Sequence, residues 1–377
     1  MIESREGAGF ADAHLHLLAF ARTCVERDLG PATCPTVEHV LEALVSVISD
    51  GPRASGWVVA RGFDDALVAE RRLPTRRELD RVCPDVPLRI RHRTGHASLL
   101  NSAACRRIDL NLHRIEPDAN GDPVLVLEAE RAVDAFSGRP PRAELVAGLA
   151  LAEAHLRRAG IDRVWDATPR TLAARAEFEG LLAEARFSIL ARTMAAPEER
   201  RAEPLDEREV VKILPHDPAA VEPSVALARR RGASVAIHAT TAIEVDAATA
   251  ALQRHAGEAF RDRVEHCTLL SAEQARRIAA LGATIVFNPG WLDSRRTKYA
   301  EQLRPAEQRA LIPMRTALDA GCRIAFGSDA PVDIPNPRRW LTNATTRPDG
   351  EAISVEEAWA AATGGGLWDD PSVRTAA

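Results

Sequence analysis

The chain has 377 residues, a formal net charge of −5 and 46% hydrophobic residues. This composition is too apolar for a disordered chain, and 27% charged residues spread along the sequence disfavour an integral membrane protein. No stretch approaches the ~18–20 uncharged apolar residues of a spanning helix, and the N-terminal MIESREGAGF has no apolar signal core. The mild acidity gives no indication of a nucleic-acid surface. We therefore expect a protein that binds neither nucleic acid nor membrane.

Cysteine and lysine usage narrows the expectation further. The six cysteines are scattered and form no CxxC pair, so we interpret them as reduced thiols of a cytoplasmic protein. Of the 49 basic residues only Lys212 and Lys298 are lysines. A lysine within an apolar strand of such an arginine-rich chain therefore calls for a reason.

Strand-like and helix-like stretches alternate along the chain. The strand-like runs are 9–17, 161–168, 187–194, 209–216, 234–240, 262–268, 283–290 and 322–330. Helix-like segments lie near 170–185, 219–232, 242–256, 271–281, 313–320 and 354–363. The segment SAEQARRIAALG (271–282) is the clearest of them, with a Ser cap, an apolar period near 3.6 and a final Gly. Eight such strands predict an α/β protein with a (β/α)8 TIM barrel.

The gap between the first two strands is too long for a single crossover. Within it, 36–50 and 142–160 are predicted as helices, and 56–63, 87–95 and 123–129 as strands. We therefore predict a barrel formed by residues 1–51 and 136–377, with a small α+β insertion at 52–135 on the first βα loop. Loops of this kind lie at the C-terminal face of a barrel, so the insertion is expected to cover the active site.

Polar residues stand at the ends of the predicted barrel strands. His14 and His16 are two residues apart at the end of the first strand, a spacing that places both side chains on one face. The other residues of this set are Lys212, His238, His266 and Asp329, on the fourth, fifth, sixth and eighth strands. Imidazole and carboxylate groups suit Zn²⁺ or a related divalent ion. A neutral Lys212 could react with CO₂ to give a carbamate whose two oxygens bridge two ions.

The order HxH, Lys, His, His, Asp on successive strands resembles the amidohydrolase superfamily. The motifs GFADAHLHL, ARGFDDALVAERRLPTRRELD, TGHASLLNSAA, VEHCTLLS and IAFGSDAPV are similar to its N-substituted formamide deformylase-like branch, amidohydrolase family 3 (YtcJ-like). The resemblance covers roughly residues 9–364. Members usually flank the barrel with a β-sandwich built from both termini, and we expect this chain to lack most of that domain.

The resemblance implies a metal-dependent hydrolase that cleaves an amide or cyclic amide C–N bond by attack of a metal-bound hydroxide. It implies that His14, His16 and Asp329 hold one ion, that His238 and His266 hold the other, and that carbamylated Lys212 bridges them. Asp329 would also move the proton from water to the leaving nitrogen. The expected partner is a small amide-type substrate, and the expected assembly is a homodimer.

Four further residues are candidates outside the metal set. His96 lies in RTGHASLLNSAA, after a strand-like run and before a helix-like one, and is a candidate catalytic residue; the alternative is that it only holds the insertion together. Asp64 and Asn101 are candidate substrate-binding residues with a structural role as the alternative. Trp291 is either a wall of the substrate pocket or core.

Two other classes of function stay open at this stage. One is a non-catalytic or regulatory protein on an amidohydrolase barrel. The other is a deaminase or an ester or phosphoester hydrolase that uses the same residues. The lysine favours hydrolysis at a two-metal centre, because one-metal deaminases lack it.

Overall fold

The computed structural model describes most of the chain. The described residues are 9–53, 55–93, 97–109, 111, 114–127, 137, 140–197, 209–215, 217–257 and 260–367. His96 and His216 lie outside them. The described chain divides into two compact units, one comprising Met1–Phe20 with Ala152–Ala377 and the other Ala21–Leu151.

The first unit is built on a single parallel sheet. In the part of the chain that the structure describes, this sheet has eight strands in the order β1-β8-β9-β10-β11-β12-β13-β14. They are β1 (Phe10–Leu15), β8 (Ile161–Arg170), β9 (Leu190–Ala195), β10 (Val210–Ile213), β11 (Ser234–Ala239), β12 (Arg263–His266), β13 (Thr284–Phe287) and β14 (Arg323–Phe326). All pairings between neighbouring strands are parallel.

The two ends of this sheet meet, so the strands nearly close into a barrel. The segment after β14 bonds to the end of β1, where the Asp329 amide donates to the His14 carbonyl at 2.7 Å. The His16 amide donates to the Ala330 carbonyl at 2.8 Å. Most residues of β10 to β14 are buried, as expected for strands covered on both faces. The predicted TIM-barrel class is confirmed.

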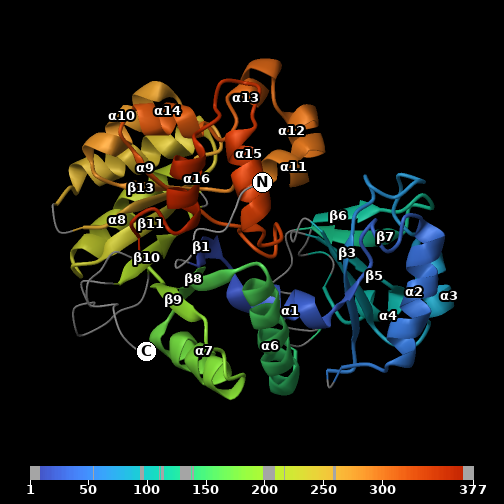
Figure 1. Cartoon of the computed structure of the whole chain (residues 1–377). Helices are drawn as coiled ribbons and strands as arrows, with labels where there is room; N and C mark the ends of the chain where they lie inside the picture. The colour runs from blue at the N-terminus through green and yellow to red at the C-terminus, as the bar shows by residue number, and fades with distance from the viewer. Residues whose placement is uncertain are drawn as a thin grey trace. The chain divides into compact units, whose positions relative to one another are not determined.

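Helices cover the outside of the barrel strands (Figure 1). They are α7 (Leu172–Glu184), α8 (Val221–Arg229), α9 (Ala242–Arg254), α10 (Ala272–Ala280), α11 (Trp291–Ser294), α12 (Arg296–Gln302), α13 (Pro305–Arg309), α14 (Met314–Asp319), α15 (Pro337–Thr345) and α16 (Val355–Ala362), with a 3-10 turn η2 (Pro218–Ala220) before α8. Helix α10 has the predicted start, since Ser271 and Gln274 form a reciprocal capping box. Gly282, with φ +66°, follows the end of this helix in the left-handed conformation that favours glycine.

The second unit contains a mixed sheet of six described strands in the order β2-β3-β4-β5-β7-β6. They are β2 (Arg27–Asp28), β3 (Val58–Phe63), β4 (Leu88–His92), β5 (Ala97–Leu100), β6 (Arg114–Pro117) and β7 (Pro123–Leu127). The helices of this unit are α2 (Val37–Ser49), α3 (Arg76–Val82) and α4 (Ser102–Cys105), and the chain passes between the units within α1 (Leu17–Val25) and α6 (Arg142–Arg158). Its core joins the apolar face of α2, with Val40 and Leu44, to Phe63 and Ile90 of the sheet.

The insertion departs from its predicted elements after His96. The run that follows it begins as strand β5, and helix is confined to the four residues of α4. All four residues of β5 are buried, so its side chains have no alternating pattern that would mark a strand in the sequence. The compact unit Ala21–Leu151 contains the whole predicted insertion. The predicted domain boundaries, and the place of the insertion over the active site, stay predictions.

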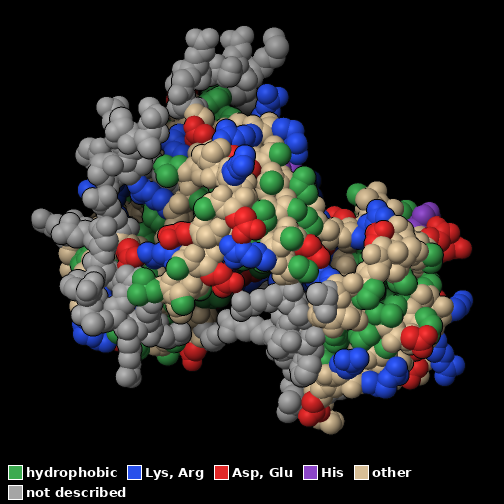
Figure 2. Space-filling view, turned by 90° about the horizontal axis from the view of Figure 1, so that it is seen from below, with side chains coloured by type: hydrophobic (Ala, Val, Ile, Leu, Met, Phe, Trp, Pro, Cys, Tyr) green, Lys and Arg blue, Asp and Glu red, His purple; other side chains and the backbone are tan. Residues whose placement is uncertain are grey.

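The surface and the helix lengths agree with the composition. Figure 2 shows acidic and basic side chains interspersed over the face that it presents. Among the described residues, no helix is both long enough and apolar enough to cross a membrane.

Candidate metal centre

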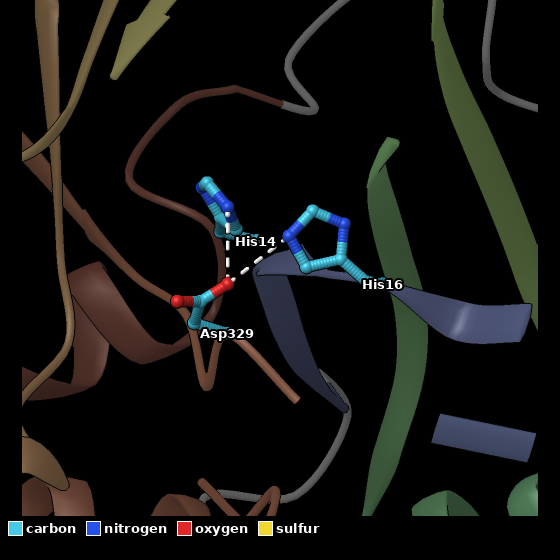
Figure 3. A group of neighbouring side chains, drawn as sticks. All are labelled: His14, His16 and Asp329. Atoms are coloured by element: carbon cyan, nitrogen blue, oxygen red, sulfur yellow. Dashed lines mark ion pairs between the residues drawn. The ribbon is translucent and has the colours of Figure 1, made fainter. Parts of the chain in front are cut away.

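Six predicted ligands stand at the carboxyl ends of barrel strands. His14 and Lys212 lie on β1 and β10, His238 on β11, and His266 is the last residue of β12. Figure 3 shows that Asp329, from the segment after β14, points toward both histidines of β1. Because the carboxyl ends of parallel strands meet at one rim of a barrel, residues far apart in the sequence gather there.

One carboxylate oxygen receives both histidines of the HxH pair. Asp329 Oδ1 is 3.4 Å from His14 Nε2 and 3.3 Å from His16 Nε2 (Figure 3). These three side chains form a group whose potential ligand atoms all lie within 4.8 Å of one another. The side chain of His14 is 1% exposed, whereas that of His16 is 32% exposed, so the group is open on the His16 side.

The other ring nitrogen of each of three histidines is engaged away from this group. His14 Nδ1 bonds to Glu265 Oε2, and His16 Nδ1 lies 3.0 Å from Thr168 Oγ1. His266 Nδ1 lies 2.7 Å from Asn288 Oδ1. Partners on Nδ1 fix the orientation of an imidazole ring and leave Nε2 for a metal ion.

The backbone turns sharply at two of the predicted ligands. His266 has φ +73° and Asp329 has φ +59°, both in the left-handed region that non-glycine residues seldom adopt. At the end of β12, Glu265 bonds to His14 while the next residue, His266, packs against the His14 ring. Consecutive strand residues normally point to opposite faces, so the turned backbone lets both side chains enter the site. Such conformations concentrate at functional sites.

Ring contacts join the remaining histidines to the group. The His266 ring centroid is 4.7 Å from that of His14 and 4.6 Å from that of His238. Trp291, at the start of α11, stacks on His266 with centroids 5.0 Å apart and ring planes at 11°. Trp291 is therefore buried against a predicted ligand, and the indole fixes that face of the imidazole.

Lys212 is buried among these groups, with 2% exposure. Its Nζ has no hydrogen-bond partner within the described ranges of the chain. Burial lowers the pKa of this amine to about 8, although the carboxylates of Glu265 and Asp329 act in the opposite direction. At pH 7 about a tenth of Lys212 is then neutral, the form that reacts with CO₂.

Burial also keeps the histidines neutral. It lowers the pKa of His266 to about 3 and that of His238 to about 4, assisted by neighbouring His238 and Lys212 respectively. The pKa of His14 is also well below its usual range, chiefly because the ring is buried. For Asp329, burial would raise the pKa, but the bond from His16 and the surrounding imidazoles hold it below its usual range. The site thus offers neutral imidazoles and an ionised carboxylate near pH 7.

The chemistry of this donor set fits a divalent cation. The Glu265 carboxylate can only accept, so the hydrogen of a neutral His14 ring lies on Nδ1 and the Nε2 lone pair faces Asp329 Oδ1. Two acceptor atoms 3.4 Å apart are unfavourable on their own, and a cation between them removes the conflict. Two imidazoles and a carboxylate are ligands that Zn²⁺ and related ions take in proteins.

Four residues that support the ligands were not predicted: Glu265, Asn288, Thr168 and Asp12. Asp12 is fully buried and accepts from the Ser328 hydroxyl at 2.6 Å and the Ser328 amide at 3.0 Å, which ties β1 to the segment that carries Asp329. The sequence holds a signal for two of them. Asp12 continues the alternate-residue spacing of His14 and His16, and the short β12 sequence RVEH carries three polar residues where a barrel strand should be apolar.

The remaining candidates belong to the second unit or lie outside the described residues. Asn101 is fully buried; its amide oxygen accepts from Leu88 and Ala104 amides at 2.9 Å, and its nitrogen donates to the Cys83 and Val86 carbonyls. These bonds use the whole side chain within the insertion, so the structural alternative accounts for it. His96 cannot be placed because it is outside the described residues.

Asp64 belongs to a second group of potential ligands, with Asp65 and His92 at the ends of β3 and β4. His92 Nε2 is 3.2 Å from Asp65 Oδ1 and 4.0 Å from Asp64 Oδ1. The guanidinium of Arg93 lies 3.7 Å from the other oxygen of Asp64. These contacts already balance both carboxylates, so this group has less need of a cation than the one in the barrel.

Comparison with known proteins identifies the family. The sequence profile of the amidohydrolase family matches residues 8–368. The chain belongs to the amidohydrolase family. This amidohydrolase is 22% identical over 392 residues to the protein named amidohydrolase YtcJ in Bacillus subtilis (strain 168), covering 90% of this chain and 73% of that protein. It is 26% identical over 423 residues to the N-substituted formamide deformylase of Arthrobacter pascens, covering 93% of this chain and 76% of the enzyme.

Solved structures agree with the fold of this amidohydrolase. Crystal structures of uncharacterized metal-dependent hydrolases from Pyrococcus furiosus and Pyrococcus horikoshii OT3 match it with TM-scores of 0.71 and 0.70. Their sequence identities are 22% and 19%; each match covers 94% of this chain, and 80% and 79% of the respective hydrolase. At this identity the likeness concerns the fold.

Proposed function

We propose that this amidohydrolase is a metal-dependent hydrolase of C–N bonds in amides or cyclic amides. The observation that carries the proposal is the convergence of His14 Nε2 and His16 Nε2 on one oxygen of Asp329, with the Nδ1 atoms of both rings engaged elsewhere. Membership of the amidohydrolase family supports it. The named activity of the Arthrobacter relative makes N-substituted formamides the first substrates to test.

Two sets of residues would hold the ions. His14, His16 and Asp329 form one set, and His238 with His266 forms the other. Lys212 would join them as a carbamate: its neutral nitrogen attacks CO₂, one N–H proton leaves, and the product carries two carboxylate oxygens. A divalent ion, most simply Zn²⁺, supplies Lewis acidity toward a carbonyl oxygen and toward water at such a site.

Asp329 has the properties of the proton carrier. It is held in the ionised form and lies beside the partly exposed His16, where water and substrate have access. Its carboxylate would accept a proton from the attacking water and deliver it to the nitrogen of the breaking C–N bond. The buried imidazoles of His14 and His266 stay neutral and do not compete for that proton.

The test combines metal content with a substrate panel. Elemental analysis of protein purified without chelator should find one to two divalent ions per chain. The panel should contain N-substituted formamides, cyclic amides, esters and phosphotriesters, assayed before and after chelation. We expect amide hydrolysis that chelation removes and that the added metal restores.

Matched variants sharpen this test. Asp329→Asn and His14→Ala should lose metal and hydrolysis together, whereas His255→Ala, at the end of α9, should lose neither. A chain without stoichiometric metal, whose hydrolysis is indifferent to chelators, would contradict the proposal. Metal without turnover on any compound would favour the non-catalytic alternative, and preferred ester cleavage would favour a different hydrolase.

A further inference from the structure

The interior of the barrel holds a charged pair that reaches a predicted ligand from the opposite side. Arg263 and Glu265 lie on β12, and both side chains are 0% exposed. Arg263 Nε donates to Glu265 Oε1 at 2.7 Å, and Arg263 Nη2 donates to Oε2 at 3.1 Å. The Glu265 Oε2 atom also bonds to His14 Nδ1.

This contact crosses the barrel. Strands β13 and β14 lie between β12 and β1 in the sheet, so Glu265 meets His14 through the interior and not along the sheet. Arg263 Nη2 makes a second link to β1, because it donates to the Ala13 carbonyl at 2.6 Å. The pair therefore holds both the ring of His14 and the backbone next to it.

Stability alone does not explain the pair. Branched apolar side chains usually fill the interior of a TIM barrel, and a buried ion pair is often no more stabilising than apolar residues of similar volume. The corresponding partners of His16 and His266 are the neutral side chains of Thr168 and Asn288. Glu265 differs from them in two ways: it can only accept a hydrogen, and it carries a full charge that Arg263 balances.

We propose that Glu265, balanced by Arg263, is a positioning residue that keeps the hydrogen of His14 on Nδ1 and the Nε2 lone pair directed at the metal position. The inference rests on the proposed function, since it concerns the same metal centre. Its consequence is metal affinity: carboxylate partners of ligand histidines typically contribute 10–100-fold. Removal of Glu265 should therefore weaken metal binding by that factor in a protein that still folds.

The experiment measures the dissociation constant for Co²⁺ on chelator-stripped protein, by competition with a chromophoric chelator. The main variant is the double substitution Arg263→Met with Glu265→Leu, which removes both charges and keeps a similar volume, so that neither charge is left buried alone. We expect about 10–100-fold weaker binding than in the wild type. Glu265→Gln retains an acceptor for Nδ1–H and should fall between the two.

A matched control separates positioning from general stability. Gln274 is a buried polar residue of α10 whose amide donates to the Ala242 carbonyl at 2.8 Å, and it contacts no predicted ligand. Gln274→Ala should lower the melting temperature and leave the Co²⁺ affinity unchanged. The inference is overturned if the double variant binds Co²⁺ as tightly as the wild type, or if Gln274→Ala weakens binding equally. Failure of the wild type to bind Co²⁺ would refute the proposed function itself, and this inference with it.

Discussion

Lys212 gives the most quantitative prediction, because its amine is buried without a hydrogen-bond partner among the described residues. Burial lowers the pKa of Lys212 from its ordinary value of 10.5 to about 8. This shift corresponds to about 3 kcal/mol of unfolding free energy, with each unit contributing about 1.4 kcal/mol. Lys212→Met removes the buried charge and fills a similar volume. We expect the metal-free variant to be more stable than the metal-free wild type by about 3 kcal/mol at pH 7.

The sign of the pH dependence follows from the same shift. Between pH 8 and pH 10.5 the unfolded chain holds a proton on Lys212 that the folded chain has released, so the stability of the wild type rises with pH in this window. The advantage of Lys212→Met should therefore shrink as the pH rises from 8 toward 10.5. Below pH 8 it should be constant, because the amine is then protonated in both states.

The assay is urea unfolding of chelator-stripped protein in CO₂-depleted buffer between pH 7 and pH 10. Ile213→Met, next to Lys212 on β10 and also buried, provides the control, since it changes packing without a titrating group. Its difference from the wild type should not vary with pH. A Lys212→Met protein that is less stable than the wild type at pH 7, or a difference that is independent of pH, would refute the reasoning. Hydrolysis should be lost in Lys212→Met and in Lys212→Arg, since neither side chain can form a carbamate.

Three further predictions concern the insertion and the histidines. Asn101→Ala should destabilise the protein by about 2–4 kcal/mol without changing metal content, because it leaves buried backbone groups unpaired; urea unfolding with elemental analysis checks this, and an unchanged stability would restore a substrate-binding role. His96→Ala should retain metal and lose ~10²–10³ in turnover if the side chain donates to the reacting group, whereas normal turnover would leave it a packing role. For His238, burial holds the pKa at about 4, below its ordinary 6.5, so the unfolded chain binds a proton that the folded chain does not; metal-free protein should lose stability as the pH falls from 6.5 toward 4, and thermal melts should show a shallower loss in His238→Asn.

The barrel and its ligand order could be predicted from the sequence because they depend on local patterns. Short apolar runs that end in a polar residue mark buried parallel strands, and capping residues such as Ser271 mark where the helices begin. The two-residue spacing of His14 and His16 directs both rings to one face, and the structure places both beside Asp329. The family resemblance supplied the rest of the ligand order.

The contacts that prepare the ligands depend on tertiary structure. Glu265 lies 251 positions from the His14 ring that it orients, and no local pattern connects the two. Strand β5 could not be distinguished from a buried helix, because a short, wholly buried run has no period. Asn101 stands in a motif associated with the family, yet the fold engages its whole side chain in hydrogen bonds to the backbone. The pKa values that make His14, His266 and Lys212 suitable ligands arise from burial, which is decided only when distant strands close around them.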